Sequence, residues 1–213
     1  MVRVYLFTSI LITFKAKPGS DTFIDAVAKR IISATLNGAA VDVSNYDGES
    51  IFLKNLAEQN TLIIEMEAIY SKTGEGLHRF VDPADGEVYL YSQHQANDSR
   101  RTFASFDQPD LKATYEFQVI APSKWEVISN TPVTERKDLG NGKTHWTYAK
   151  SQIFSTYLTC FVAGPYHYVT DEYKGEKTIP LGIYCRKSLA PHLDSEEFFL
   201  LTKQGFAFYE KEF

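Results

Sequence analysis

The residues that first suggest chemistry lie near the middle of the chain, in Ser92-Gln93-His94-Gln95. They follow an apolar run that is typical of a buried or half-buried β-strand. Alternate residues of a strand share a face and lie roughly 6–7 Å apart, so Gln93 and Gln95 should share a face with Tyr89 and Tyr91, while His94 points the other way. Two amide oxygens on one face can converge on a single ammonium group. Taken without further information, simple solvation of two amides at a sheet edge explains the pattern as well.

Other combinations of reactive residues have simpler explanations. The five histidines show no spacing typical of metal ligands, and the sequence contains neither His-Glu-x-x-His nor Gly-x-Ser-x-Gly nor a phosphate loop. Asp98, Asp107 and Asp110 lie near Arg100 and Arg101 and have the residue types of a catalytic carboxylate cluster. However, Asp107-Gln108-Pro109-Asp110 is also typical of a capped turn before a strand, which we favour.

Composition excludes some classes of partner. The chain has 213 residues, is 44% hydrophobic and carries a net charge of −5, with Lys and Arg scattered along its length. A chain of this size can bury a full core. Because no basic stripe or block is present, we expect no nucleic-acid partner and no binding to an anionic membrane.

The two cysteines and the start of the chain bear on location. Cys160 and Cys185 each lie in an apolar strand pattern, which favours two buried free thiols over one disulfide. Residues 1–19 superficially resemble a signal peptide, since Arg3 precedes an apolar run. The run lacks a small-residue cleavage site and is too short to span a bilayer, so we predict a strand there and a cytoplasmic protein.

The elements that position these residues follow a period of two. Leu62, Ile64, Met66 and Ala68 alternate with Ile63, Glu65 and Glu67, and residues 111–119 alternate in the same way, which predicts strands with one buried face. Asn37-Gly38 and Asn141-Gly142 are typical of tight hairpin turns. Further strands are predicted at residues 125–129, 155–163 and 179–185. The stretch Thr73 to His78, TGEGLH, is expected to be a turn.

The last segment has a helical pattern instead. Phe198, Leu201, Gly205, Phe208 and Tyr209 recur at helical spacing, with Asp194 as a candidate cap and two glutamates in the first turn. The expected fold class is therefore mainly β, with one amphipathic helix at the C-terminal end.

Several ordered motifs resemble one family. They are TGEGLHRFVDPADGEVYLYSQHQANDSRRTFASFDQPDLKATYEFQVIAPSKWEVISN, STYLTCFVAGPYH, IPLGIYCRKSL and KQGFAFYEKEF. Together they are similar to the N-terminal region of aminopeptidase N, a zinc aminopeptidase of the gluzincin class. The resemblance implies an antiparallel, saddle-like β-sandwich domain over residues 1–186, followed over residues 187–213 by the first helix of a catalytic domain.

The resemblance also implies what this chain lacks. In that family, the Gly-Ala-Met-Glu-Asn loop and the His-Glu-x-x-His zinc helix follow soon after the segment that KQGFAFYEKEF matches, and this sequence ends at Phe213 before both. The first part of the sheet is also expected to be missing. We therefore expect a fragment that binds no zinc itself, is inactive alone, and partners the missing catalytic domain of the same polypeptide.

A role for the two glutamines follows from the resemblance as well. Gln93 and Gln95 match the amide and the final residue of the family's Thr/Ser-Gln-x-Glu/Gln motif, which implies that they bind the free α-amine at the N-terminus of a peptide substrate. Most of the negative charge that attracts the amine would then come from the glutamate of the absent loop. The alternative is a free-standing β-sandwich module for carbohydrate or protein, with its 13 Tyr and 15 Phe as a binding platform.

Overall fold

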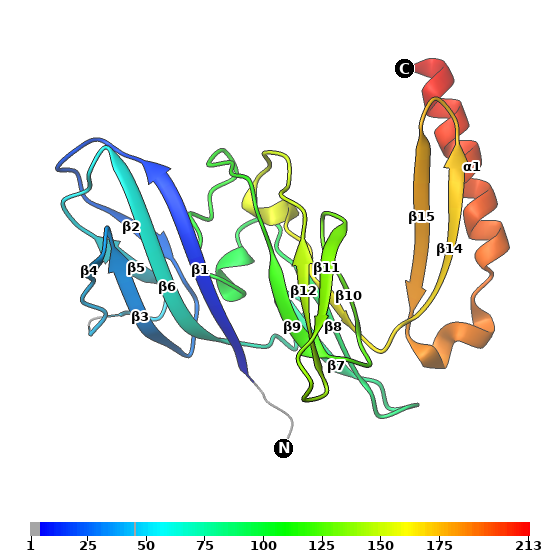
Figure 1. Ribbon diagram of the computed structural model, residues 1–213, viewed down its shortest axis with the longest axis horizontal. Coiled ribbons are helices and arrows are strands. Elements are labelled where there is room, and N and C mark those ends of the chain that lie inside the picture. The colour runs from blue at the N-terminus through cyan, green and yellow to red at the C-terminus, as the bar shows by residue number, and fades with distance from the viewer. Residues whose placement is uncertain (1–4, 45) are drawn as a thin grey trace.

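The chain folds into antiparallel sheets and ends in one long helix. The computed structural model describes residues 5–44 and 46–213, and Figure 1 shows its elements from the N-terminal sheet to the terminal helix. The strands are β1 (Tyr5–Lys15), β2 (Thr22–Asp25), β3 (Arg30–Leu36), β4 (Ala39–Ala40), β5 (Ser50–Leu53), β6 (Gln59–Ile69), β7 (Gly76–Val81), β8 (Val88–Gln93), β9 (Gln118–Pro122), β10 (Glu126–Ile128), β11 (Val133–Asp138), β12 (Lys143–Tyr148), β13 (Val162–Gly164), β14 (His167–Lys174) and β15 (Thr178–Cys185). The helices are η1 (Ser99–Arg101), η2 (Thr156–Leu158), η3 (Lys187–His192) and α1 (Ser195–Glu212).

The N-terminal sheet has the strand order β1-β6-β3-β4. Its central strand β6 buries every second residue, including Leu62, Ile64, Met66 and Ala68, so the predicted alternation is confirmed. These side chains pack with the buried Ile24 of the small β2-β5 sheet in one hydrophobic core. The strand predicted near the start is β1, although residues 1–4 lie outside the described residues.

A second core lies under the middle strands. One sheet has the order β10-β13-β8-β7 and another the order β11-β12-β9. Leu77, Leu90, Val127 and Trp146 from these sheets pack together and are almost fully buried. Because β8 is flanked by β7 on one side and β13 on the other, its backbone is held by ladder hydrogen bonds along both edges.

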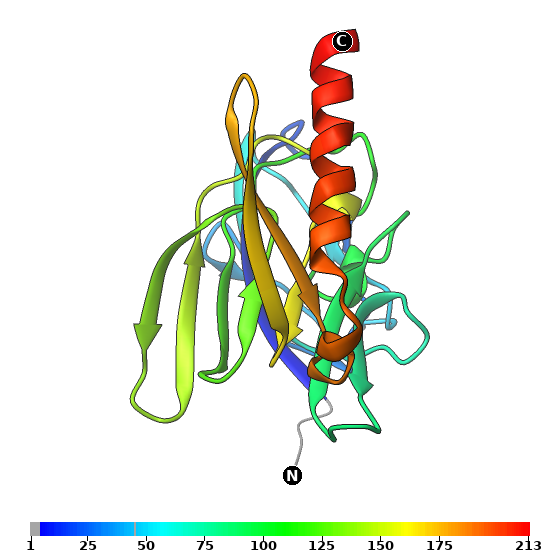
Figure 2. The same cartoon turned by 90° about the vertical axis from the view of Figure 1, so that its right-hand side faces the viewer.

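The C-terminal part consists of the β14-β15 hairpin and α1, which lie beside each other in Figures 1 and 2. The Asp194 carboxylate accepts a hydrogen bond from the Glu197 N–H, as expected of a helix cap. Phe199 is buried, and the ring of Phe206 stacks on Tyr173 of β14 at 5.2 Å.

The apolar residues that predicted the helix face away from this hairpin. Between 57 and 61% of each of Phe198, Leu201, Phe208 and Tyr209 is exposed. The helix therefore has two apolar sides, and only the side with Phe199 and Phe206 is packed within the described chain. The mainly β, antiparallel fold with one C-terminal helix is confirmed.

Both predicted hairpins are present, but only one has the expected turn. Asn37 and Gly38, between β3 and β4, have φ values of 53° and 82°, as a two-residue turn of this type requires. Between β11 and β12 the positive φ angles belong to Gly140 and Gly142, and the loop spans residues 139–142. Its Leu139 N–H donates to the Lys143 carbonyl at 2.9 Å, so the loop is longer than predicted.

Two strand predictions were wrong in extent. Regular strand within residues 111–119 begins only at Gln118, because the preceding backbone bonds irregularly to residues 149–154, with a single bridge between Ala113 and Phe154. Within residues 155–163 the chain forms η2 and then only the start of β13. Cys160 and Cys185 are free, as expected, but half-buried rather than buried.

Candidate functional site

The candidate site lies at the C-terminal end of β8. Gln93 is the last residue of this strand and pairs with Gly76 on β7. Two residues earlier, Tyr91 pairs with His78 on β7 and Val162 on β13. The rings of Tyr91 and His78 are in contact, with centroids 4.8 Å apart.

Only part of the predicted glutamine face is open. Tyr91 is 42% exposed, whereas Tyr89 is 1% exposed, because its ring packs against Tyr166 with centroids 5.0 Å apart. The Tyr89 hydroxyl donates to the Asp85 carboxylate at 2.7 Å and accepts the Lys187 N–H at 3.1 Å. Burial raises the pKa of Tyr89 to about 12, so its hydroxyl stays protonated. The accessible surface therefore starts at Tyr91 and continues through the glutamines.

Gln93 and Gln95 are both exposed and lie next to each other. The Gln95 N–H donates to the Gln93 side-chain oxygen at 3.1 Å. Within residues 5–44 and 46–213, the Gln95 side chain has no hydrogen-bond partner. An amide oxygen accepts two hydrogen bonds, so both side-chain oxygens keep the capacity to accept a proton from a ligand.

A compact turn follows the strand and carries Gln95. The Asp98 N–H donates to the His94 carbonyl at 3.0 Å and closes the turn. The Asp98 carboxylate in turn accepts from Arg101 Nε at 2.7 Å. Gly76 allows η1 to approach β7, because a Cβ at this position would lie 2.8 Å from the Arg101 Cβ.

The three aspartates considered as a carboxylate cluster have separate structural roles. Asp107 is buried, and its carboxylate accepts from the Thr156 hydroxyl at 2.6 Å and from the Arg100 N–H at 3.0 Å. Asp98 pairs with Arg101, as described above, and Asp110 is exposed. The Leu111 N–H donates to the Gln108 carbonyl, so the favoured interpretation of this segment as a turn is confirmed.

Sequence analysis missed the residues that support this turn from behind. Thr102, Thr156 and Thr159 are 3–4% exposed and all make side-chain hydrogen bonds to the segment between His94 and Asp107. Thr156 and Thr159 lie far along the chain from this segment, and no local pattern marks them. Only the tertiary fold brings these hydroxyl groups to the turn.

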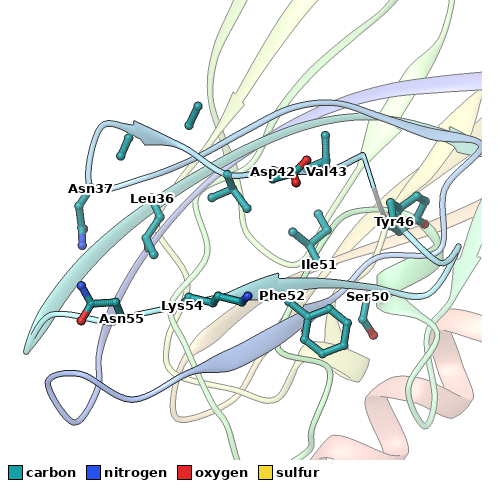
Figure 3. Close-up of a pocket in the computed structure, with 13 residues that line it drawn as sticks. Leu36, Asn37, Asp42, Val43, Tyr46, Ser50, Ile51, Phe52, Lys54 and Asn55 are labelled. Carbon is teal, nitrogen blue, oxygen red and sulfur yellow. The ribbon is translucent and has the colours of Figure 1, made fainter.

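A separate hollow of about 580 Å³ lies in the N-terminal part of the molecule. Figure 3 shows Asp42 and Val43 on one side of it and Phe52 and Lys54 of the β5 region on the other. Its aromatic lining residues are Tyr46 and Phe52, and the Tyr46 hydroxyl is already bound to the Ala26 carbonyl. None of its lining residues comes from β8, so the hollow is not part of the glutamine site.

A scan against family models identifies the fold. Residues 8–158 match the Peptidase M1 N-terminal domain. The chain belongs to this family. The matched residues of the M1 N-terminal domain include both glutamines, the turn after them and the buried aspartate.

Similar curated proteins are aminopeptidases. The chain is 46% identical over 201 residues to aminopeptidase N of Streptomyces lividans, which covers 93% of this chain and 23% of that protein. It is 29% identical over 180 residues to glutamyl aminopeptidase of Rattus norvegicus, covering 82% of this chain and 18% of the relative. The M1 N-terminal domain described here thus spans about a quarter or less of the length of these relatives.

A solved structure supports the same fold. The crystal structure of Legionella pneumophila aminopeptidase A in complex with aspartic acid matches with a TM-score of 0.75 at 20% identity, covering 88% of this chain and 23% of that one. At this identity, the match establishes the fold alone.

The described part of the M1 N-terminal domain shows neither a metal-binding cluster nor a membrane-spanning helix. No group of three His, Cys, Asp or Glu side chains in this part of the chain is placed to hold a metal ion. None of the helices described here is long and apolar enough to cross a membrane.

Proposed function

We propose that this chain forms one wall of the substrate cleft of a zinc aminopeptidase and that Gln93 and Gln95 help to bind the free α-amine of the peptide. The observation that carries the proposal is the pair of exposed amides at the end of β8, with the Gln95 side chain unpartnered among the described residues. Family membership and the aminopeptidase names of the relatives support it.

The chemistry assigned to this chain is positioning. An ammonium group has three donors, and amide oxygens on neighbouring residues can accept two of them. Holding the amine fixes the first peptide bond of the substrate one residue further along, which is the geometry that an enzyme removing N-terminal residues needs. Both glutamines are neutral, so we propose that a carboxylate outside this chain supplies the attractive charge.

Zinc is assigned to residues outside this chain. The described residues offer no cluster that fits a metal ion, so we propose that the zinc ligands and the general base lie elsewhere in a longer polypeptide. On this proposal the chain by itself cleaves no aminoacyl amide. One tightly held zinc per purified chain, measured by elemental analysis, would contradict it.

Amine binding can be tested on the chain as it stands. In ¹H–¹⁵N NMR spectra, leucinamide should shift the side-chain amide signals of Gln93 and Gln95. N-acetyl-leucinamide is the matched control ligand, because it keeps the side chain and the amide but has no ammonium group. If both compounds gave equal shifts, the amine-binding role would be refuted.

Activity provides the stronger test in the longer polypeptide. A hydrogen bond to a charged group contributes about 1.5–3 kcal/mol, so Gln95→Ala should lower kcat/KM for aminoacyl substrates roughly ten- to a hundredfold, and Gln93→Ala by a similar or smaller factor. Gln95→Glu adds a negative charge near the ammonium and should retain far more activity than the alanine variant. Zinc content should stay the same in all three.

We further propose a domain boundary between residues 186 and 187, with residues 187–213 forming the first helix of the catalytic domain. Contacts cross this boundary, since the Ser188 hydroxyl donates to the buried Asp82 carboxylate at 2.5 Å and the Lys187 N–H donates to the Tyr89 hydroxyl at 3.1 Å. A chain ending at Arg186 should still fold and be more monodisperse. An unfolded circular dichroism spectrum of that variant would instead assign the C-terminal segment to the β-domain.

The alternative of a free-standing carbohydrate- or protein-binding module makes a different prediction about the gene. Translation beyond the codon for Phe213 should reveal Gly-Ala-Met-Glu-Asn and His-Glu-x-x-His if the aminopeptidase proposal is right. A stop codon at that point favours the module. We also propose a cytoplasmic location, which cell fractionation tests directly.

A further inference from the structure

The residue between the two glutamines is a buried histidine. His94 is 1% exposed, and its ring lies edge-on to Phe103 and Phe161 with centroids 6.0 and 6.4 Å apart. The imidazole must therefore find partners for two polar nitrogens inside the core.

Both nitrogens do find partners, and the pattern fixes one neutral tautomer. Nδ1 lies 3.0 Å from the Thr159 carbonyl oxygen, which can only accept, so Nδ1 carries the proton. The Thr159 hydroxyl, 2.8 Å from Nδ1, donates its own proton to the Thr156 carbonyl and is also an acceptor toward the ring. Nε2 is then the acceptor for the Thr102 hydroxyl at 2.9 Å. Burial lowers the pKa of His94, which keeps this neutral form at neutral pH.

These hydrogen bonds tie the glutamine segment to two other parts of the chain. Thr102 directly follows η1, and Thr159 directly follows η2. The backbone carbonyl of His94 also accepts the Asp98 N–H, so side chain and main chain of the same residue are held. His94 directly joins Gln93, the last residue of β8, to Gln95 in the turn, so a movement that released His94 from the core would displace both glutamines.

We propose that His94 is a positioning residue whose clamped imidazole sets the orientation in which Gln93 and Gln95 are presented to an ammonium group. This inference rests on the proposed amine-binding role of the glutamines. His94 itself touches no ligand, because its side chain is buried in the core. Phenylalanine at this position would fill a similar volume but would leave the Thr159 carbonyl without its donor.

Hydrogen exchange on the 213-residue chain tests the clamp directly. The reporters are the N–H groups of Gln95, bonded to the Gln93 side chain, and of Asp98, bonded to the His94 carbonyl. In His94→Phe and in Thr102→Val, exchange at both should accelerate about tenfold or more, while amides of β12 keep their rates. Thr102→Ser retains the hydroxyl and should restore slow exchange.

A second buried threonine provides the matched control. Thr144 in β12 is 8% exposed, and its hydroxyl donates to the Ser123 hydroxyl at 3.0 Å, away from the turn. Thr144→Val removes one buried hydrogen bond of the same kind and should leave exchange at Gln95 and Asp98 unchanged. If Thr144→Val accelerated them as much as Thr102→Val, the effect would be general destabilisation and the clamp would be refuted.

A titration separates this inference from the proposed function. Leucinamide should bind Thr102→Val several-fold more weakly than the unmodified chain, with the melting temperature lowered no more than in Thr144→Val and binding recovered in Thr102→Ser. If the turn loosens while Gln95→Ala leaves kcat/KM of the longer polypeptide unchanged, the clamp stands and the amine-binding proposal fails. If the unmodified chain binds leucinamide while both His94→Phe and Thr102→Val keep slow exchange and full affinity, His94 has no positioning role.

Discussion

The turn after β8 and the terminal helix α1 are held in opposite ways. The turn is short and exposed at Gln93 and Gln95, yet polar groups behind it are buried and paired, with Asp107 and His94 each bonded to other segments. The helix is long and regular, but it contacts the rest of the chain along one side only, through Phe199, Phe206 and a few polar groups.

The two regions differ in whether their exposed surfaces are well solvated. The turn has an open outer surface of neutral amides, which water solvates well, and a fully supported inner side. The outer side of α1 instead exposes large apolar residues, among them Phe198 and Leu201, whose contact with water is unfavourable. The geometry of the turn is therefore fixed by contacts within this chain, whereas the outer side of α1 leaves large apolar side chains exposed.

Neighbouring phenylalanines of α1 should give the largest contrast. Phe199→Ala removes a buried ring and should lower the free energy of undocking α1 by roughly 3–4 kcal/mol. Phe198→Ala removes a ring that is 57% exposed and should change it by less than about 0.5 kcal/mol, while reducing self-association. Hydrogen exchange of the α1 amides and analytical ultracentrifugation measure the two effects. Equal stability losses would mean that the outer side is packed as well.

The buried aspartate of the turn should come next. Asp107→Ala leaves the Arg100 N–H and the Thr156 hydroxyl without their acceptor and should cost about 3 kcal/mol in urea unfolding. Asp110→Ala is the control, because this exposed residue lies three positions further on in the same segment, and its replacement should cost less than about 0.5 kcal/mol. A loss below 1 kcal/mol for Asp107→Ala would show that the turn does not depend on this network.

Replacing two glycines of the β7-β8 region distinguishes the cost of backbone strain from the cost of a steric clash. Gly76 and Gly86 have similar φ values, 63° and 71°, but only at Gly76 would a new Cβ meet other atoms, 2.8 Å from the Arg101 Cβ. Gly76→Ala should therefore cost about 1–2 kcal/mol more than Gly86→Ala. Thermal unfolding of the two variants provides the comparison. Equal losses would indicate that η1 can move away from β7 without penalty.

The smallest expected effect is a pH dependence. Burial lowers the pKa of His94 in the folded chain below its ordinary value of 6.5. As the pH falls below 6.5, His94 therefore binds a proton in the unfolded chain but stays neutral in the folded chain. The stability present above pH 6.5 should then decline by at most about 1.4 kcal/mol per pH unit, until the folded pKa is reached. The hydrogen bond to the Thr159 carbonyl and the nearby Asp107 and Asp98 carboxylates oppose this lowering of the pKa and narrow the pH range. Urea unfolding of His94→Phe should lack this part of the pH dependence. If the free energy of unfolding fell equally steeply with pH in both proteins, a group other than His94 would cause the pH dependence.

Sequence patterns predicted the elements whose signals are local. Alternating burial in β6, the turn at Asn37-Gly38 and the Asp194 cap each depend on a few neighbouring residues, and each was confirmed. Gln93 and Gln95 are exposed and His94 is buried, as their predicted opposite directions imply, although β8 ends at Gln93 and the strand predicted for His94 and Gln95 is absent.

Features that depend on distant contacts could not be predicted in this way. The backbone before β9 looked like a strand because its side chains alternate, but its hydrogen-bond partners lie in the irregular segment 149–154. Tyr89 lies two residues before Tyr91 and was expected on the same open face, yet Tyr166 and Lys187 cover it. Likewise, nothing near His94 in the sequence indicates that Thr159 will bind its ring. Periodicity gives the direction of a side chain but not what lies above it.

The contact between Tyr89 and Lys187 has a mechanical consequence. Tyr89 and Gln93 lie on the same strand, four residues and roughly 13 Å apart, and Lys187 begins the segment that leads into α1. Since β8 is braced on both edges, it cannot easily stretch or tilt relative to its neighbours. The start of the segment that leads into α1 and Gln93 are therefore attached to the same strand, so a contact that shifted Lys187 would act on β8 through the Tyr89 hydroxyl.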